Sequence, residues 1–213
     1  MMTLITGGAK CGKSALAEKL LEGAADKVYM ATMIPYGEEA HAAIARHRTI
    51  RAGKGFRTLE LYTDLQQADV RGCSVLLECM GNLCANELFR EDGPAEKEDA
   101  PEKTAETDPQ EPEAPVMARV PDTAAYIIEG IHFLRAQAKE LVIVTNQVGA
   151  DGMDYAGGTM AYIRLLGEVN RAAAQMADTV IECVYGIPVV LKGNLQLNGC
   201  FPKAVQDASG RLG

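Results

Sequence analysis

The residues with the clearest chemical potential run from Gly7 to Ser14 and fit the pattern G-x-x-x-x-G-K-S without a mismatch. In such a loop, glycines turn backbone N–H groups inward around a polyphosphate, and the helix that follows adds the positive end of its dipole. Lys13 would contact the β- and γ-phosphates, and the Ser14 hydroxyl can reach Mg²⁺. A chance glycine-rich turn is the weaker interpretation, because a strand pattern precedes the loop and a helical pattern follows it. The segment therefore predicts nucleotide binding by Gly7, Gly8, Ala9, Lys10, Cys11, Gly12, Lys13 and Ser14.

A carboxylate ends the apolar run Val75-Leu76-Leu77-Glu78. A phosphate loop needs an acidic partner for Mg²⁺, and a neighbouring parallel strand would end close to the phosphates. Glu78 could instead cap the helix that starts near Met80, and both roles could hold at once. We favour the magnesium role.

A second reactive group surrounds His47, within the run Arg46-His47-Arg48-Thr49-Ile50-Arg51. Three arginines form a cationic patch that suits a triphosphate. They also disfavour the imidazolium and leave a neutral imidazole that can act as a nucleophile. The ordinary alternative is a solvated or packed histidine on a helix.

Short apolar runs alternate with helical patterns along most of the chain. Strands are predicted at Met2–Thr6, Val28–Ala31, Phe56–Glu60, Val75–Cys79, Leu141–Thr145, Thr179–Val184 and Pro188–Lys192. Helices are predicted at Lys13–Glu22, Glu38–Arg48, Gly81–Arg90, Thr123–Lys139 and Met160–Ala177. The alternation predicts an α/β, P-loop NTPase-like fold, in which helices cover both faces of a mostly parallel central sheet.

The 213 residues carry a net charge of −8, and all of it lies in one stretch. Residues 91–115 hold ten acidic residues, two lysines and five of the nine prolines, so the rest of the chain is neutral. Such a stretch cannot bury enough apolar surface to offset its ordering entropy. We expect a single domain over residues 1–213 with a disordered acidic insertion at about 91–118. The acidic balance also argues against nucleic-acid binding through overall charge.

The six cysteines form no C-x-x-C pair, so a zinc ribbon is not indicated. The first residues lack the pattern of a secretory signal, and no apolar run is long enough to span a membrane. We therefore expect a cytoplasmic protein with reduced thiols. Cys11 could be an oxidation-sensitive thiol inside the loop, although a small residue that fills a serine position is the favoured interpretation. Core positions are expected for Cys73, Cys79, Cys84 and Cys183.

Further motifs follow the loop in a fixed order. Tyr29-Met30-Ala31-Thr32 precedes His47, which comes fifteen residues after Thr32, and His47, Arg48 and Arg51 fit H-[RK]-x-x-R. Later matches are Thr58, Glu60, Leu77-Glu78-Cys79, Asn86, Val144, Asn146, Val148, Gly149, Gly167, Asn170, Ala177-Asp178, Val180, Gly186, Pro188 and Lys192. In this combination the chain resembles the bifunctional adenosylcobinamide kinase / adenosylcobinamide-phosphate guanylyltransferase family of cobalamin biosynthesis. The resemblance covers residues 1 to about 192 except the acidic insertion.

The resemblance implies two reactions. The first phosphorylates adenosylcobinamide with ATP or GTP, and the second transfers GMP from GTP to that phosphate through a guanylyl-histidine on His47. Mg²⁺ would be held by Ser14 and Glu78, although Glu78 could instead contact the base or ribose. Nucleotide contacts are also implied for Ala31, Thr32, Met33, Arg48, Arg51 and Glu60; an exposed carboxylate at a strand end is the alternative for Glu60. A homotrimer is implied as well.

The chain departs from the family pattern at Lys10, Cys11, Ala43, Ala52, Phe56, Gln147 and Arg164, and across Asp151–Gly158. If the region after Gly149 seats the corrinoid, one of the two activities could be altered or lost. Two alternatives therefore stay open, a kinase without transferase activity and a non-catalytic nucleotide sensor. A structural protein that binds no nucleotide is the least favoured.

Overall fold

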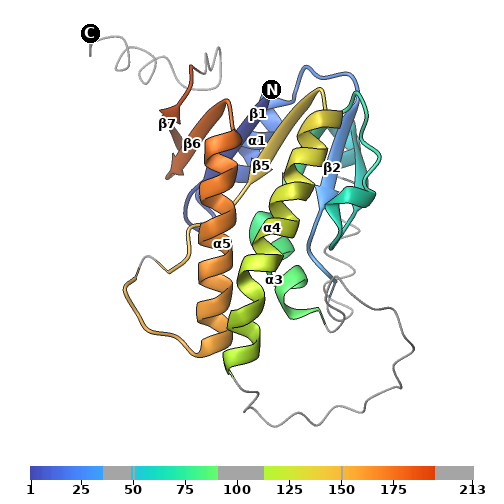
Figure 1. The fold of residues 1–213 in the computed structure, drawn as a ribbon. Helices are drawn as coiled ribbons and strands as arrows, with labels where there is room; N and C mark the ends of the chain where they lie inside the picture. The colour runs from blue at the N-terminus through green and yellow to red at the C-terminus, as the bar shows by residue number, and fades with distance from the viewer. Residues whose placement is uncertain (36–48, 50, 91–112, 150, 195–213) are drawn as a thin grey trace.

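A computed structural model describes residues 1–35, 49, 51–90, 113–149 and 151–194 (Figure 1). The strands are β1 (Met2–Thr6), β2 (Lys27–Ala31), β3 (Phe56–Glu60), β4 (Ser74–Glu78), β5 (Glu140–Val144), β6 (Thr179–Val184) and β7 (Ile187–Lys192). The helices are α1 (Lys13–Leu20), the 3-10 helix η1 (Leu65–Gln67), α3 (Met80–Phe89), α4 (Glu113–Gln137) and α5 (Gly157–Met176). Every predicted strand is confirmed to within one residue at each end. The helix predicted at Glu38–Arg48 lies outside the described residues.

The strands form one sheet in the order β3-β2-β4-β5-β1-β6-β7. All neighbours pair in parallel except β7, which runs antiparallel to β6. The mostly parallel sheet of the sequence prediction is therefore confirmed. Parallel strands end at the same edge of a sheet, so the residues after β1, β2 and β4 come together there.

Helices cover both faces of this sheet, as predicted. Along β5, Leu141 and Ile143 pack into one buried cluster with α3, α4 and α5, whereas Val142 and Val144 pack into a second cluster with α1. Figure 1 accordingly shows α4 and α5 side by side on one face and α1 behind the sheet. Burial on both faces explains why the central strands read as continuous apolar runs rather than as alternating ones.

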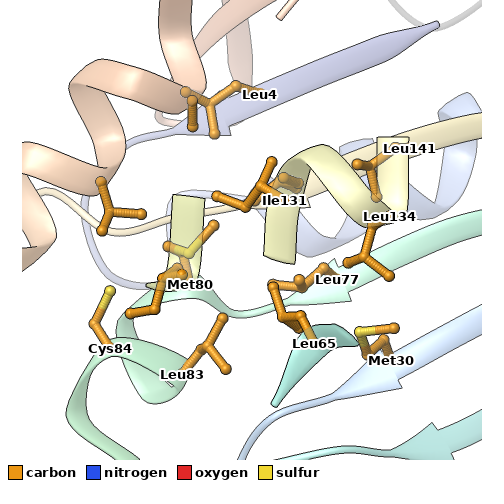
Figure 2. Close-up of a cluster of buried hydrophobic side chains, with 14 of the residues drawn as sticks. Leu4, Met30, Leu65, Leu77, Met80, Leu83, Cys84, Ile131, Leu134 and Leu141 are labelled. Atoms are coloured by element: carbon orange, nitrogen blue, oxygen red, sulfur yellow. The ribbon is translucent and has the colours of Figure 1, made fainter. Parts of the chain in front are cut away.

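The larger cluster forms the core between the sheet and the helices α3 and α4 (Figure 2). Ile131 and Leu134 of α4 point toward Leu77 of β4 and Leu141 of β5, and all four side chains are at most 1% exposed. None of the described helices is long and apolar enough to cross a membrane.

Helix α4 begins at Glu113, so the sequence analysis placed its start ten residues too late. It runs through positions assigned to the end of the acidic insertion, whose remaining residues 91–112 lie outside the described chain. Pro121 lies inside this helix, although proline cannot donate an intrahelical hydrogen bond. The helix nevertheless passes through Pro121, which is exposed, and buries Val120, Ala124 and Ile127. Apolar spacing of three and four residues thus outweighed the proline.

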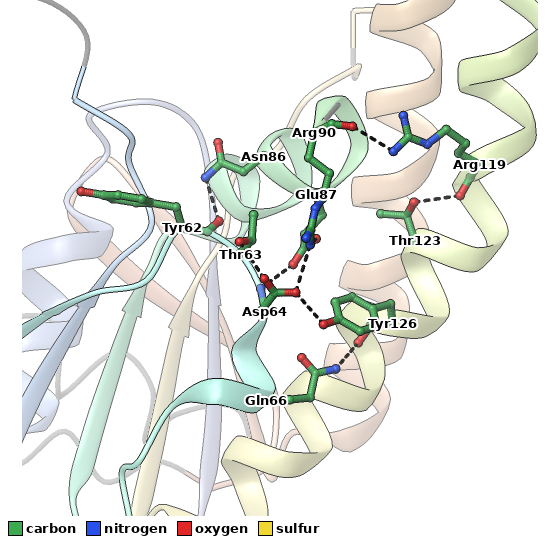
Figure 3. A network of polar contacts seen from close by, with 10 residues as sticks. All are labelled: Tyr62, Thr63, Asp64, Gln66, Asn86, Glu87, Arg90, Arg119, Thr123 and Tyr126. Atoms are coloured by element: carbon green, nitrogen blue, oxygen red, sulfur yellow. Dashed lines mark hydrogen bonds and ion pairs between the residues drawn. The ribbon is translucent and has the colours of Figure 1, made fainter. Parts of the chain in front are cut away.

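A polar network joins α3, α4 and the chain before η1 (Figure 3). Asp64 accepts hydrogen bonds from Tyr126 (2.6 Å) and Arg90 (3.0 Å), and its own N–H donates to Glu87 (2.7 Å). Arg90 also contacts Glu87 at 3.0 Å, and Glu87 is only 4% exposed. Burial opposes the ionisation of Asp64, but the hydrogen bonds from Tyr126 and Arg90 outweigh it and hold the pKa of this carboxyl below its usual value. The network fixes α3, which starts beside the end of β4.

Candidate active site

The loop between β1 and α1 has the backbone that phosphate binding requires. Gly7 has a φ of 144°, and a Cβ atom there would lie 2.5 Å from the carbonyl oxygen of Cys183. Gly12 precedes α1 with a φ of 101°, and Lys10 is in the left-handed region with a φ of 57°. A side chain at Gly7 would therefore be both strained and blocked. The turn leads directly into the N-terminus of α1, where unpaired N–H groups attract anions.

Lys13 and Ser14 are the first two residues of α1 and point in different directions. The Lys13 side chain is buried against the loop, where its ammonium donates to the carbonyls of Gly7 (3.0 Å) and Gly8 (2.6 Å). The Ser14 hydroxyl instead donates to Oε1 of Glu78. The structure therefore brings together two of the residues that the sequence assigned to the metal.

Glu78 reaches Ser14 from a strand that is not adjacent to β1, since β5 lies between β1 and β4. The prediction of a direct neighbour was wrong, but the shared sheet edge still brings the carboxylate to the loop. The second oxygen of Glu78 accepts a hydrogen bond from the buried Tyr29 hydroxyl at 2.9 Å. Cys79, not Glu78, precedes α3 as its cap residue, and no side chain caps this helix. The capping alternative for Glu78 is therefore not observed.

A hydroxyl beside a carboxylate is a suitable donor pair for Mg²⁺, which keeps several waters and takes few protein oxygens. Among the described residues, no group of three or more His, Cys, Asp and Glu side chains is arranged to hold a metal. Ser14 and Glu78 thus fit the magnesium of a bound nucleotide, and they do not resemble a metal site that the protein would fill by itself.

A cavity of about 470 Å³ opens beside this pair. Its lining combines loop, strand and helix residues, namely Ser14, Glu18, Tyr29, Ala31, Met33, Arg51, Lys54, Glu60, Glu78, Cys79 and Asn82. The guanidinium of Arg51 lies 3.7 Å from the centre of the Tyr29 ring. Burial and the nearby Glu78 raise the pKa of Tyr29, so its hydroxyl stays a donor to that carboxylate. Glu60 accepts a hydrogen bond from Tyr62 at 3.2 Å.

Thr32 differs from the other expected nucleotide contacts. Its side chain is fully buried, and its hydroxyl donates to the carbonyl of Cys79 and accepts from the N–H of Cys79, both at 2.8 Å. Its backbone N–H and carbonyl are engaged by Glu78 and by Asn86. The structure therefore gives Thr32 a structural role, the joining of β2 to the start of α3. A buried polar partner of this kind is not visible in a sequence.

His47 and Arg48 lie outside the described residues, so their predicted roles stay predictions. The sequence analysis missed five lining residues, namely Glu18, Tyr29, Lys54, Cys79 and Asn82. Lys54 follows Arg51 by one helical turn, and that spacing could have indicated it. Tyr29 was used only as part of a motif, since the partner of its hydroxyl becomes known only in the fold.

Comparison with known proteins shows the family of this chain. Residues 3–191 match the family model described as cobinamide kinase / cobinamide phosphate guanyltransferase. The chain is 32% identical to the bifunctional adenosylcobalamin biosynthesis proteins CobU of Salmonella typhimurium and of Escherichia coli, over 90% of this chain and 100% of each relative. It is 27% identical to the bifunctional adenosylcobalamin biosynthesis protein CobP of Pseudomonas aeruginosa, over 91% of this chain and 98% of the relative. The chain therefore belongs to the cobinamide kinase / cobinamide phosphate guanyltransferase family.

Proposed function

We propose that this protein phosphorylates adenosylcobinamide with ATP or GTP and then transfers GMP from GTP to the new phosphate. The products of the second reaction are adenosylcobinamide-GDP and pyrophosphate. The observation that carries the proposal is the contact between Ser14 and Glu78, made beside the phosphate loop and open to a cavity that Arg51 and Glu60 also line. Phosphoryl transfer requires hydrogen-bond donors to the phosphates, a carboxylate for the metal ion and a fixed cation.

The second reaction runs through a covalent intermediate on His47. A neutral imidazole nitrogen attacks the α-phosphorus of GTP, an N–P bond forms, and the bond to the β-phosphate oxygen breaks as pyrophosphate leaves. A phosphate oxygen of the corrinoid substrate then attacks the same phosphorus and releases the histidine. Arg48 and Arg51 stabilise the charge that develops on the phosphate oxygens.

In the phosphorylation step, Lys13 binds the transferred phosphate at the start of α1, and the loop N–H groups orient the rest of the triphosphate. Ser14 and Glu78 hold Mg²⁺, which neutralises phosphate charge when it is bound. Tyr29 keeps Glu78 directed toward Ser14 through the hydrogen bond of its hydroxyl. Ala31, Met33 and Glu60 line the space beside these groups, where a nucleoside would lie.

The decisive experiment incubates the protein with Mg²⁺ and GTP labelled at the α-phosphate, denatures it and measures retained label. We expect a label that is labile in acid and stable in base, as a phosphoramidate is, and that is absent from His47→Ala. His132→Ala is the matched control and should keep the label, since His132 is a helical histidine remote in sequence from Arg46, Arg48 and Arg51. Absence of label in the unmodified protein, with GTP still bound, would leave only the kinase reaction.

We also infer a homotrimer that acts in the cytoplasm, where GTP and ATP are supplied. Support for the assembly comes from β7, which lies at one end of the sheet and carries four side chains that are 39–58% exposed, namely Ile187, Val189, Val190 and Leu191. Apolar patches on an edge strand favour association. Light scattering during size-exclusion chromatography measures the mass directly, and a monomer would contradict the assembly.

A further inference from the structure

Two cysteines lie next to each other at the phosphate loop and pack in the same apolar cluster. Cys11 lies within the loop, and Cys183 lies near the end of β6. The Cys183 thiol donates to the carbonyl of Cys11 at 3.0 Å, and the N–H of Gly186 donates to the same carbonyl at 2.8 Å. No pattern in the sequence pairs these residues, because they stand 172 positions apart.

Glycines pack against both sulfur atoms. A Cβ atom on Gly7 would lie 2.9 Å from Sγ of Cys11, and a Cβ atom on Gly12 would lie 3.6 Å from Sγ of Cys183. The two thiols therefore occupy the narrow space behind the loop. Both also line a cavity of about 490 Å³ together with Gly8, Lys10 and Tyr185. Cys11 is partly exposed whereas Cys183 is buried, so Cys11 is the thiol that a small solute reaches first.

We propose that Cys11 and Cys183 form an oxidation site, at which a peroxide converts the two thiols into a disulfide that weakens nucleotide binding. The inference rests on the proposed binding of nucleoside triphosphates by the loop. In the first step the Cys11 thiol loses its proton and the thiolate attacks hydrogen peroxide. The O–O bond breaks, Cys11 sulfenic acid forms, and the hydroxide that leaves takes up the proton as water. In the second step the Cys183 thiol attacks that sulfur, the S–S bond forms, and a second water leaves. Two thiols lose two electrons in total, and the peroxide gains them.

The disulfide acts on binding through the loop backbone. An S–S bond of about 2.05 Å and a Cβ–Cβ distance of about 3.8 Å would fix Cys11 against β6 at that spacing. The Cys11 carbonyl would also lose its hydrogen bond from the Cys183 thiol. Lys13 is two residues away and its ammonium lies 3.9 Å from Sγ of Cys11, so a displaced loop also displaces the phosphate-binding cation. Recognition by preorganised donors tolerates errors of only about 0.5 Å.

The test uses the full chain with Cys200→Ser, because Cys200 lies outside the described residues and could form a separate disulfide with another cysteine. The protein is treated with hydrogen peroxide, then digested with trypsin without reduction. Cys11 lies in the peptide 11–13 and Cys183 in the peptide 172–192, whereas Cys73, Cys79 and Cys84 share the peptide 72–90. We expect the first two peptides to be joined, with a mass lower than their sum by two hydrogen atoms.

Binding of guanosine 5′-[β,γ-imido]triphosphate with Mg²⁺ is measured before oxidation, after it and after dithiothreitol. We expect at least a tenfold rise in Kd that dithiothreitol reverses. Cys183→Ser should resist peroxide when compared with its own untreated state, and Cys73→Ser should respond like the parent. Absence of the joined peptide overturns the proposal, and so does a joined peptide with unchanged affinity. Failure of the reduced parent to bind the analogue would instead overturn the proposed function, while the peptide map still decides the disulfide.

Discussion

At the scale of single residues, Glu78 is the centre of the site because two hydroxyls hold its carboxylate from opposite sides. Ser14 contacts one oxygen and belongs to the phosphate loop, whereas Tyr29 contacts the other and belongs to β2. Tyr29 also carries Arg51 on its ring and meets Phe56 edge-on at 6.3 Å. One buried tyrosine thus links the carboxylate to Arg51, which we propose binds phosphate.

Tyr29→Phe tests this link, because it removes the hydroxyl and keeps the ring under Arg51. We expect the Mg²⁺ concentration for half-maximal guanylylation to rise about tenfold, which is typical when a partner of a metal ligand is lost. The maximal rate at saturating Mg²⁺ should change little. A magnesium titration of covalent labelling measures both quantities. Tyr29→Leu is the comparison, since it also removes the ring; an unchanged magnesium curve in Tyr29→Phe would contradict the positioning role.

At the scale of secondary-structure elements, the strands were predictable and the start of helix α4 was not. Each strand is a short apolar run, and burial on both faces leaves little ambiguity in such runs. The loop was equally clear, since its glycines and Lys13 are fixed by local geometry. The start of α4 and the partners of Thr32 and Tyr29 depend on contacts between distant segments, which no local pattern contains. The prediction that β1 and β4 are neighbours was wrong for the same reason, because strand order is a property of the whole sheet.

The first turns of α4, which the sequence analysis did not predict, contain Pro121, and this position has a measurable effect on stability. The Pro121 ring removes the N–H that would bond to the carbonyl of Met117 inside α4. Pro121→Ala should restore that bond at an exposed position and raise the free energy of unfolding by about 1–3 kcal/mol. Urea unfolding followed by circular dichroism measures the change. Asp122→Ala changes the exposed neighbouring residue and is the control for the general stabilisation of a helix by alanine. An equal rise in the free energy of unfolding in both variants would contradict the explanation.

The network around Asp64 should make the anchoring of α3 depend on pH. The folded pKa of Asp64 lies below its unfolded value of about 3.9, so its stabilisation is complete at neutral pH and is lost as the pH falls below about 4. Asp64→Asn should lower the free energy of unfolding by about 1–2 kcal/mol at pH 7. Asparagine also tolerates the φ of 56° at this position.

Unfolding in urea at pH 7, 5 and 3.5 provides the check on Asp64. The difference between Asp64→Asn and the parent should shrink at the lowest pH. Asp69→Asn is the matched control, because Asp69 pairs with Arg71 on the surface and such pairs contribute little. A difference that stays constant with pH would show that the ionised form of Asp64 is not what stabilises the network.

At the scale of the whole molecule, the acidic residues 92–112 can be separated from the fold. Arg119 of α4 donates to the carbonyl of Arg90, so the end of α3 lies near the first turns of α4. Glu113 is six residues before Arg119, about 9 Å along the helix, and a Gly/Ser linker of six residues can span about 20 Å. Replacement of 92–112 by such a linker is therefore geometrically possible.

We expect this replacement to keep one unfolding transition and to raise Tm by about 2–4 °C. A shorter loop lowers the entropic cost of loop closure by about 1 kcal/mol of free energy. For a chain of this size, that gain corresponds to a rise of a few degrees in Tm. The exchange removes eight acidic residues and two lysines, so most of the net charge of −8 disappears and solubility near pH 7 should fall. Calorimetry separates the change in Tm from the change in solubility, because the loss of charge repulsion alters association between molecules and not the stability of the fold. A Tm that drops by 5 °C or more would mean that these residues pack against the body, and the single domain with a disordered insertion would have to be abandoned.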